Sequence, residues 1–502
     1  MTPPNKSTTQ PKSPAPPTRM PSGIPGLDRV LGGGFFQSGA YIIQGLPGCG
    51  KTIFANQLCF GHVAQGGRAL YVTLLAESHA RMLQHLRTLS FFDESAIPQK
   101  LSYVSAFSEL ESEGLKGLIG ILRQEMRARK ATLLVLDGLL AVSETAESAR
   151  DLKKFVHELQ TNAMFHGCTV FMLTSGALHG INAERTMVDG LVELEDHLFD
   201  MRAQRTIRVS KFRGSASLRG RHEFQITDDG LRVFPRTEAL YDQPVTEQGA
   251  GGVRGLGTGI ASLDQMLAIG GLPEASSTVV VGSTGTGKTT LGLHFLSQSS
   301  AQQPGLLFGF FEMPEQLKAN ARSLGLDLDK LEKEGALSLL WHAHGENGLD
   351  ELAHQLLSEV EAKGVKRLMI DGLSGFFEST AYPERIGRFF ACLTNELRRR
   401  GVTTMMSLET RDAVGSTVPT PYGVSAIVDN LLFLRHVESR GEVKRMLSFI
   451  KVRASRFDHA IRELAISPDG VKVSGRFSTG GDVLPTVAPV AGADGLRDSE
   501  QH

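Results

Sequence analysis

The stretch Gly45–Thr52 reads GLPGCGKT, and the stretch Gly282–Thr289 reads GSTGTGKT. Both match the P-loop pattern G-x-x-x-x-G-K-[ST], in which a glycine-rich loop between a strand and a helix surrounds nucleotide phosphates with its backbone N–H groups. The two matches lie in different halves of a chain of 502 residues. The sequence therefore predicts two nucleotide sites in two copies of one domain.

A tandem repeat extends well beyond the two P-loops. Further blocks recur in the same order in both halves, which is typical of a duplicated domain. The paired blocks are Ser22–Asp28 with Thr258–Asp264, Leu70–Glu77 with Leu306–Glu312, Thr132–Leu139 with Leu368–Leu373, Lys211–Arg213 with Lys451–Arg453, and Asp229–Val233 with Asp469–Val473. We expect a disordered tail over residues 1–20, domains over 21–245 and 246–478, and a flexible tail over 479–502.

Composition narrows the class of protein. The net charge of −1 argues against nucleic acid as a partner. The sequence contains no apolar run of 18 residues, so we expect no membrane-spanning helix. The four cysteines are scattered, which argues against a zinc ribbon or a disulfide framework and suits a reducing cytosol. We therefore expect a cytoplasmic protein with no membrane partner.

Strand and helix patterns alternate within each copy. A short apolar strand leads into each P-loop, a helix begins at Lys51 or Lys288, and later strands end near a Glu and at an Asp. Such alternation, with apolar runs buried on both faces, predicts an α/β fold with a mainly parallel sheet. After Asp196 and Asp429 the pattern becomes strand-rich, which predicts an antiparallel extension at the sheet edge.

The P-loops supply the predicted contacts to ATP and Mg²⁺. Lys51 and Lys288 reach the β- and γ-phosphates, while Thr52 and Thr289 offer hydroxyls to the metal, together with Asp137 and Asp371 at the ends of apolar strands. The predicted nucleotide-binding residues are Gly45, Gly48, Gly50, Lys51 and Thr52 in the first copy, and Gly282, Thr284, Gly285, Thr286, Gly287, Lys288, Thr289 and Thr290 in the second.

Two further recurring features suggest catalysis. Glu77 and Glu312 follow strands whose carboxyl ends face the ligand crevice, so each is a candidate to orient or deprotonate the attacking water. The alternative is an acid that merely favours the start of the following helix. The K-x-R pairs are Lys211 with Arg213 and Lys451 with Arg453. They are either solvated charges on an edge strand or cations that reach a neighbouring subunit's γ-phosphate.

These motifs together resemble the KaiC family of circadian-clock ATPases, which belongs to the RecA superfamily. The resemblance covers about Pro21 to Phe477 and includes Asn320–Gly325, Val437–Glu442 and Ala460–Glu463. It implies two tandem RecA-like domains, a hexameric double ring with ATP between protomers, and slow ATP hydrolysis by the first domain. It also implies serine/threonine autokinase activity in the second domain, with both K-x-R pairs supplied by the adjacent subunit.

The chain departs from the family pattern at three places. Ala76 and Phe311 stand where the family has the first of two adjacent glutamates, and in the second domain that glutamate is the supposed base for phosphotransfer. The family's Ser-Thr phosphosite falls on Ser425 and Ala426, while Thr420 matches a further family threonine. The C-terminal tail differs from the one that binds KaiA in the family, so KaiA is not expected as a partner. The family resemblance leaves a KaiB-like protein or a sensor kinase as the expected partner.

Two other functions remain open at this point. A DNA-dependent RecA-type motor, such as a RadA-like recombinase or a DnaB-like helicase, shares the P-loop but calls for a basic DNA-binding surface. A signalling scaffold read by a partner through its nucleotide state needs the nucleotide sites without true kinase activity.

Overall fold

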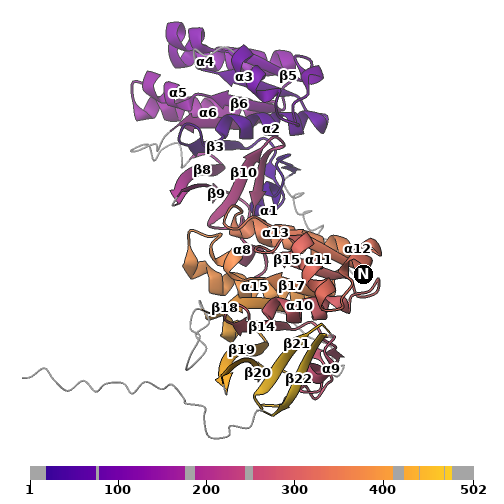
Figure 1. Cartoon of the computed structure of the whole chain (residues 1–502). Helices are drawn as coiled ribbons and strands as arrows, with labels where there is room; N and C mark the ends of the chain where they lie inside the picture. The colour runs from indigo at the N-terminus through magenta and orange to yellow at the C-terminus, as the bar shows by residue number, and fades with distance from the viewer. Residues whose placement is uncertain are drawn as a thin grey trace, which may run out of the picture. The chain divides into compact units, whose positions relative to one another are not determined.

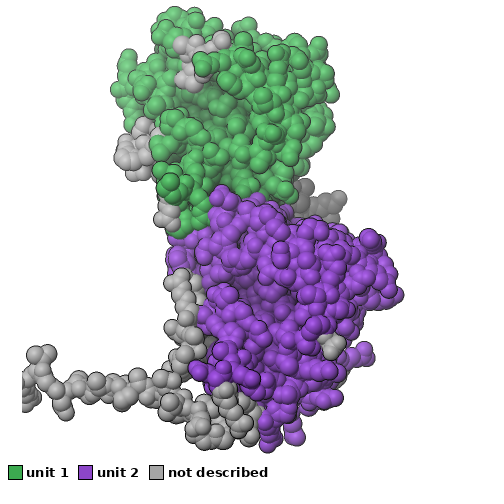
Figure 2. Space-filling view, viewed as in Figure 1, with its two compact units in different colours: residues 1–240 green, residues 241–502 purple. Residues whose placement is uncertain are grey.

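The computed structural model of the chain describes residues 18–74, 79–175, 187–199, 201–242, 253–410, 423–439, 441–468 and 470–476. The chain divides into two compact units, residues 1–240 and residues 241–502 (Figure 2). Within the described ranges, no helix is both long enough and apolar enough to span a bilayer.

The described part of the first unit contains a nine-stranded sheet in the order β11-β10-β9-β8-β3-β7-β6-β4-β5. The parallel strands are β3 (Ala40–Gly45), β4 (Ala69–Thr73), β5 (Leu101–Ser105), β6 (Leu133–Asp137), β7 (Thr169–Ser175) and β8 (Gly190–Phe199). The antiparallel strands are β9 (Arg202–Phe212), β10 (Arg221–Thr227) and β11 (Gly230–Phe234), and a separate pair is formed by β1 (Arg19–Met20) and β2 (Phe35–Phe36).

Helices cover both faces of this sheet, because its parallel strands alternate with helices along the chain (Figure 1). One face packs on α1 (Leu27–Leu31), α2 (Lys51–Ala64) and α3 (His79–Leu86). The other face packs on α4 (Phe107–Arg129), α5 (Leu139–Thr145) and α6 (Ala149–Phe165). A short helix, α8 (Thr237–Leu240), follows β11.

The second unit repeats this architecture. Its described strands form a nine-stranded sheet in the order β16-β15-β17-β18-β14-β19-β20-β21-β22. The strands are β14 (Ser277–Gly282), β15 (Gly305–Gly309), β16 (Leu337–Trp341), β17 (Arg367–Asp371), β18 (Thr403–Glu409), β19 (Asn430–Ser439), β20 (Glu442–Val452), β21 (Arg462–Ser467) and β22 (Gly470–Arg476), with β12 (Gly255–Leu256) and β13 (Leu272–Pro273) paired separately.

The helices of the second unit also divide between two faces. One core includes residues of α9 (Ala261–Asp264), α10 (Lys288–Ser297), α11 (Pro314–Ser323) and α12 (Leu328–Lys333). The other includes residues of α13 (Leu349–Lys363), α14 (Ser374–Phe377), α15 (Ile386–Arg399) and α16 (Val424–Ile427).

The predicted fold class is confirmed, with a correction to where the antiparallel part begins. Asp196 lies inside β8, and both β8 and β19 pair parallel to the P-loop strands, so antiparallel pairing starts only with β9 and β20. The residue that corresponds to Asp429 is Asp189. The Asp189 carboxylate accepts a hydrogen bond from the Ala40 backbone N–H and the Asp429 carboxylate accepts one from the Ser277 N–H, both at 2.9 Å.

Candidate functional site

The second P-loop connects β14 to the N-terminus of α10. Gly285 and Gly287 have φ angles of 77° and 100°, a region that favours glycine. A Cβ on Gly287 would also lie 2.8 Å from Ile466 Cδ1. Lys288 Nζ donates hydrogen bonds of 2.9 Å to the Gly282 and Ser283 carbonyls. The loop is thus wrapped around its own lysine at a helix N-terminus, the geometry that suits an anion.

A cavity of about 580 Å³ opens at this loop and collects residues from several strand ends. Of the predicted site residues it is lined by Thr284, Gly285, Gly287, Lys288, Thr289, Thr290, Glu312 and Asp371. Two other predicted residues shape the loop itself: Gly282 ends β14, and the buried Thr286 hydroxyl donates to the Ser283 carbonyl at 2.7 Å. The predicted phosphate-binding loop, the predicted metal residues and Glu312 of the second copy therefore meet at one cavity, whereas Lys451 and Arg453 do not line it.

Carboxylates give this cavity its electrostatic character. Asp371 accepts a hydrogen bond from the Ser407 hydroxyl, and Glu312 accepts one from Asn320 Nδ2 at 2.9 Å. Burial, and then the nearby charge of Asp371, raise the pKa of Glu312. Burial lowers the pKa of Lys288, against the opposing effect of Glu409 and Asp371. A carboxyl group with a raised pKa beside a phosphate-binding loop fits a proton acceptor or a water-orienting group.

Sequence reasoning missed several residues that line the cavity. Ser407 and Glu409 lie on β18, Arg445 on β20 and Ile466 on β21, all distant in sequence from the loop. Arg445 Nε donates to the Gly285 carbonyl at 2.9 Å and so fixes the P-loop from the antiparallel extension. For another part of the lining the sequence did hold a signal. The block Asn320–Gly325 matches the KaiC family, and it contains Asn320, the hydrogen-bond partner of Glu312.

The first P-loop has the same backbone form. Gly48 and Gly50 have φ angles of 84° and 101°, and a Cβ on Gly50 would lie 2.5 Å from Ile226 Cδ1, which corresponds to Ile466. Lys51 Nζ donates to the Gly45 carbonyl at 2.8 Å and to the Leu46 carbonyl at 2.9 Å. This agreement extends the phosphate-binding geometry to the first copy.

The surroundings of the first loop differ from those of the second. Asp137 accepts a hydrogen bond of 2.7 Å from the Tyr71 hydroxyl, whereas Asp371 is held by a serine. Burial raises the pKa of Asp137, while Tyr71 and Lys51 act in the opposite direction. Thr52, which follows Lys51 at the start of α2, is exposed. Glu77 lies outside the described residues, so its role stays a prediction.

The K-x-R pairs lie at the opposite end of the sheet from their own P-loops. Lys451 pairs with Leu431 and Leu431 with Val279, whereas the P-loop begins at the other end of β14, at Gly282. Lys211 occupies the matching position opposite Leu191, and Arg213 follows it directly after β9. Burial lowers the pKa of both lysines, and the charge of the neighbouring arginine adds to this effect.

In the second unit this pair contacts the segment with a candidate phosphosite. Lys451 Nζ donates to the Ser425 carbonyl at 3.1 Å and to the Val428 carbonyl at 2.6 Å. Arg453 Nη2 donates to the Ala426 carbonyl at 3.2 Å. Ser425 lies on α16, while the other candidate, Thr420, lies outside the described residues.

The donor set suits a magnesium ion that is shared with a nucleotide. Within the parts of the chain that the structure describes, no three His, Cys, Asp or Glu side chains group as a metal site. Mg²⁺ commonly takes only one or two protein ligands beside a phosphate and waters. Thr289 and Asp371 line the same cavity and supply that number. The residues present therefore fit ATP with Mg²⁺.

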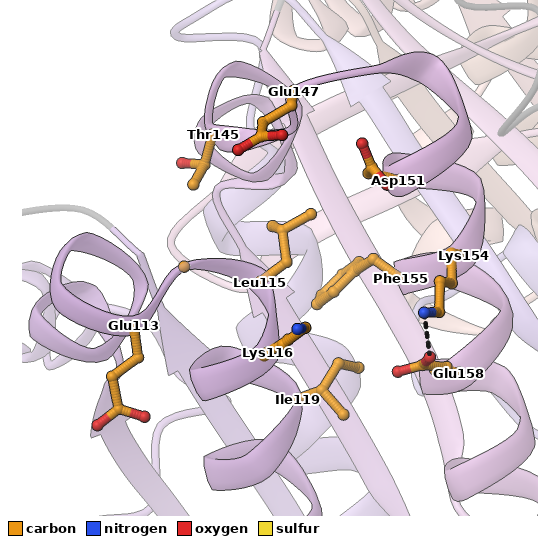
Figure 3. A pocket seen from close by; sticks show the side chains of 11 residues that line it. Glu113, Leu115, Lys116, Ile119, Thr145, Glu147, Asp151, Lys154, Phe155 and Glu158 are labelled. Carbon is orange, nitrogen blue, oxygen red and sulfur yellow. Dashed lines mark ion pairs between the residues drawn. The ribbon is translucent and has the colours of Figure 1, made fainter.

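A separate groove of about 370 Å³ lies in the first unit among α4, α5 and α6 (Figure 3). Lys116 on α4 and Phe155 on α6 are among the side chains that line it, and Lys154 forms an ion pair with Glu158 at 3.9 Å. It contains none of the predicted site residues, so we do not assign nucleotide binding to it.

Comparison with known proteins agrees with this geometry. The protein-family model described as "ATPase: KaiC" matches residues 20–238 and again residues 256–477. The circadian clock oscillator protein KaiC of Thermostichus vulcanus is 28% identical over 488 residues, which cover 95% of this chain and 92% of that protein. The KaiC of a Picosynechococcus species is 28% identical over 468 residues, 90% of this chain and 89% of its own length. KaiC 1 of a Synechocystis species is 28% identical over 470 residues, with coverage of 90% and 88%. The chain, with its two P-loop units, belongs to the KaiC family of ATPases.

Proposed function

We propose that this KaiC-family ATPase binds Mg-ATP at both P-loops and transfers the γ-phosphate in its second domain to its own Ser425 or Thr420. The observation that carries the proposal is the cavity that joins the P-loop, Asp371 and Glu312. The relatives are named circadian clock oscillator proteins, which supports a timing or signalling role. We propose a cytoplasmic location, with a KaiB-like protein or a sensor kinase as partner. We expect neither KaiA nor nucleic acid to be required.

Each group has a defined part in this proposal. Lys288 and the N–H groups of the loop hold the β- and γ-phosphates, and the Thr289 hydroxyl and Asp371 hold the metal. Bound Mg²⁺ would neutralise charge on the phosphates. Glu312 orients the attacking group, and its contact with Asn320 fixes the direction of its carboxylate. Lys51, Thr52, Asp137 and Glu77 have the same parts in the first domain.

The position of the K-x-R pairs supports a hexameric ring in which each subunit completes its neighbour's site. Lys451 lies level with Val279, three strand residues before Gly282 and so roughly 10 Å from the start of its own P-loop along the sheet, and Arg453 lies two residues farther away. Cations at that end of the sheet serve a γ-phosphate when a second subunit presents its P-loop to them. Lys211 and Arg213 take the equivalent place in the first domain.

Autophosphorylation is tested by incubation of the full chain with γ-labelled ATP and Mg²⁺, followed by mapping of the labelled residue. We expect label on Ser425 or Thr420, and the double variant Ser425→Ala with Thr420→Ala is expected to lose it. Ser358→Ala, on the exposed side of α13, is the matched control and should keep full labelling. An unlabelled wild-type chain, or label that persists in the double variant, would contradict the kinase part of the proposal.

The hydroxyl of Tyr71 allows a test of the first site through the pH dependence of ATP hydrolysis there. Its hydrogen bond lowers the pKa of Asp137, so Tyr71→Phe should raise that pKa further. As pH falls, Asp137 would then take up its proton at a higher pH and lose the metal earlier. The acid limb of ATP hydrolysis, measured in a Lys288→Ala background, should move to higher pH. The variant should also lose about 1–3 kcal/mol of stability.

Tyr103→Phe is the matched control for this experiment. Its hydroxyl donates to Asn56 Oδ1 at 2.8 Å, a half-buried hydrogen bond like that of Tyr71, but to a partner other than Asp137. We expect a similar loss of stability and an unchanged acid limb. If both variants leave the limb in place, Asp137 does not control metal binding at the first site.

A nucleotide-gated scaffold without kinase activity is the second candidate, and Phe311 favours it. This apolar side chain is 58% exposed, lines the cavity beside Glu312 and stands where the family has the supposed base. A pull-down with a KaiB-like protein should then depend on nucleotide state. The comparison of wild type with Glu77→Gln and Glu312→Gln decides this, because a partner that binds all three alike argues against gating. ATP hydrolysis that rises on addition of DNA would instead revive a DNA-dependent motor.

A further inference from the structure

Glu409 places a carboxylate at the second P-loop, at a register position that a serine occupies in the first unit. It ends β18, the strand between the P-loop strand β14 and the Asp371 strand β17, and it pairs with Gly282. In the first unit the residue in register with Gly45 is Ser175. The two sites therefore differ by one charged group at the same point of the same sheet.

The residue that binds Glu409 in the second site also differs between the two sites. Glu409 Oε1 accepts a hydrogen bond of 2.5 Å from the hydroxyl of Thr284, the third residue of the second P-loop. The third residue of the first P-loop is Pro47, which has no hydroxyl. A pair present as Thr and Glu in one site and as Pro and Ser in the other indicates a difference in chemistry between the sites.

Glu409 is also closer to the P-loop within the sheet than Glu312 is. Glu312 follows β15, and β17 and β18 lie between β15 and β14. With strands about 4.8 Å apart, this places the end of β15 roughly 14 Å from the end of β14. Glu312 is bound to Asn320, whereas Glu409 contacts the loop itself and lines the same cavity as Lys288.

We propose that Glu409 is the base that accepts the proton of the attacking hydroxyl during phosphoryl transfer at the second site, with Thr284 holding its carboxylate in place. The hydroxyl oxygen of water or of the acceptor serine bonds to the γ-phosphorus, and its proton passes to Glu409. The bond from the γ-phosphorus to the bridging oxygen breaks, and ADP leaves with the electron pair. The proton then passes to solvent. This inference rests on the proposed ATP chemistry of the second site. It supplies a base for a site in which Phe311 occupies the position of the family's glutamate base.

The test compares Glu409→Gln, Glu409→Asp and Lys288→Ala with wild type in the full chain. The difference in phosphate release between wild type and Lys288→Ala defines the part of ATP hydrolysis that occurs at the second site. Glu409→Gln should reduce this share and the labelling of the acceptor by about 100-fold. Binding of a fluorescent ATP analogue should stay within about threefold, because a neutral amide keeps the contact with Thr284 and the phosphate-binding groups are untouched.

Controls separate catalysis from structure. Glu409→Asp keeps a carboxylate, so it should keep part of the second-site rate and the fall of that rate at acid pH. The residual second-site rate of Glu409→Gln should not depend on pH in that range. Glu384→Gln changes an exposed glutamate outside the cavity and should match wild type.

Two different failures can be told apart. A Glu409→Gln chain that keeps second-site release and labelling within about threefold of wild type overturns the role of Glu409 alone. A tighter binding of the ATP analogue with unchanged turnover does the same and shows that Glu409 only competes with phosphate for the loop. A wild-type chain that releases no more phosphate than Lys288→Ala and takes no label overturns the proposed function of the second site as well.

Discussion

Lys288→Ala is expected to remove ATP chemistry from the second site, with turnover there lower by on the order of 10²–10³-fold. The ammonium lies 2.9 Å from two P-loop carbonyls, at the N-terminus of α10 and on the cavity that also holds Asp371. Burial has already lowered its pKa, so the charge is held in a partly desolvated place where it acts strongly on phosphate oxygens. Without it the γ-phosphate loses its main cationic partner from this subunit.

The measurement is phosphate release and equilibrium binding of a fluorescent ATP analogue by the full chain. Lys51→Ala is the matched variant for the other site, because Lys51 makes the same two contacts in the first loop. The double variant should release no phosphate. Lys363→Ala, at the exposed end of α13, should behave as wild type. If Lys288→Ala binds and hydrolyses ATP as wild type does, the second cavity is not a nucleotide site.

The P-loops could be predicted from sequence because their function is local. A glycine is required where φ reaches 100° and where Ile466 leaves no room for a Cβ, and the lysine and threonine must follow it directly. The ends of the apolar strands at Asp137 and Asp371 were likewise readable, since five-residue buried strands end at both. These features depend on a few neighbouring residues, and the same patterns recur in the second copy.

The rest of the site depends on strand order, which a local pattern does not contain. Glu409 meets Thr284 because β18 lies beside β14, and Arg445 meets Gly285 because β20 folds back along β19. The groups that hold Asp137 and Asp371, the two aspartates proposed to bind the metal, could not be inferred from the repeat either. Tyr71 comes from β4 and Ser407 from β18, so different strands perform this task in the two copies. Glu77 and Thr420 lie outside the described residues and stay predictions.

Arg453→Ala is expected to lower second-site turnover by about 10³-fold or more, the effect typical of an arginine supplied from a neighbouring subunit. The Arg453 side chain is 55% exposed, and its contacts within its own chain are the Ala426 carbonyl and, at 3.9 Å, the Asp429 carboxylate. Lys451 and Arg453 do not line the described cavity of their own subunit. Among the described residues, this exposed guanidinium is held by a weak ion pair and one carbonyl, so it can turn to a neighbour's phosphate at small cost.

A mixing experiment shows whether the arginine acts on its own subunit or on the next one. Arg453→Ala keeps an intact P-loop, and Lys288→Ala keeps an intact K-x-R pair, so each chain alone should be inactive at the second site. In a ring with head-to-tail contacts, mixed subunits place one intact P-loop against one intact pair at about a quarter of the interfaces. Equal mixing should therefore restore about a quarter of the wild-type second-site rate. Mixing Arg453→Ala with the Lys288→Ala, Arg453→Ala double variant should restore none, because no interface then contains the arginine. A mixture of the two single variants that stays inactive after subunit exchange would place Arg453 at its own subunit's site or outside catalysis, and would remove the main support for intersubunit ATP sites in this protein.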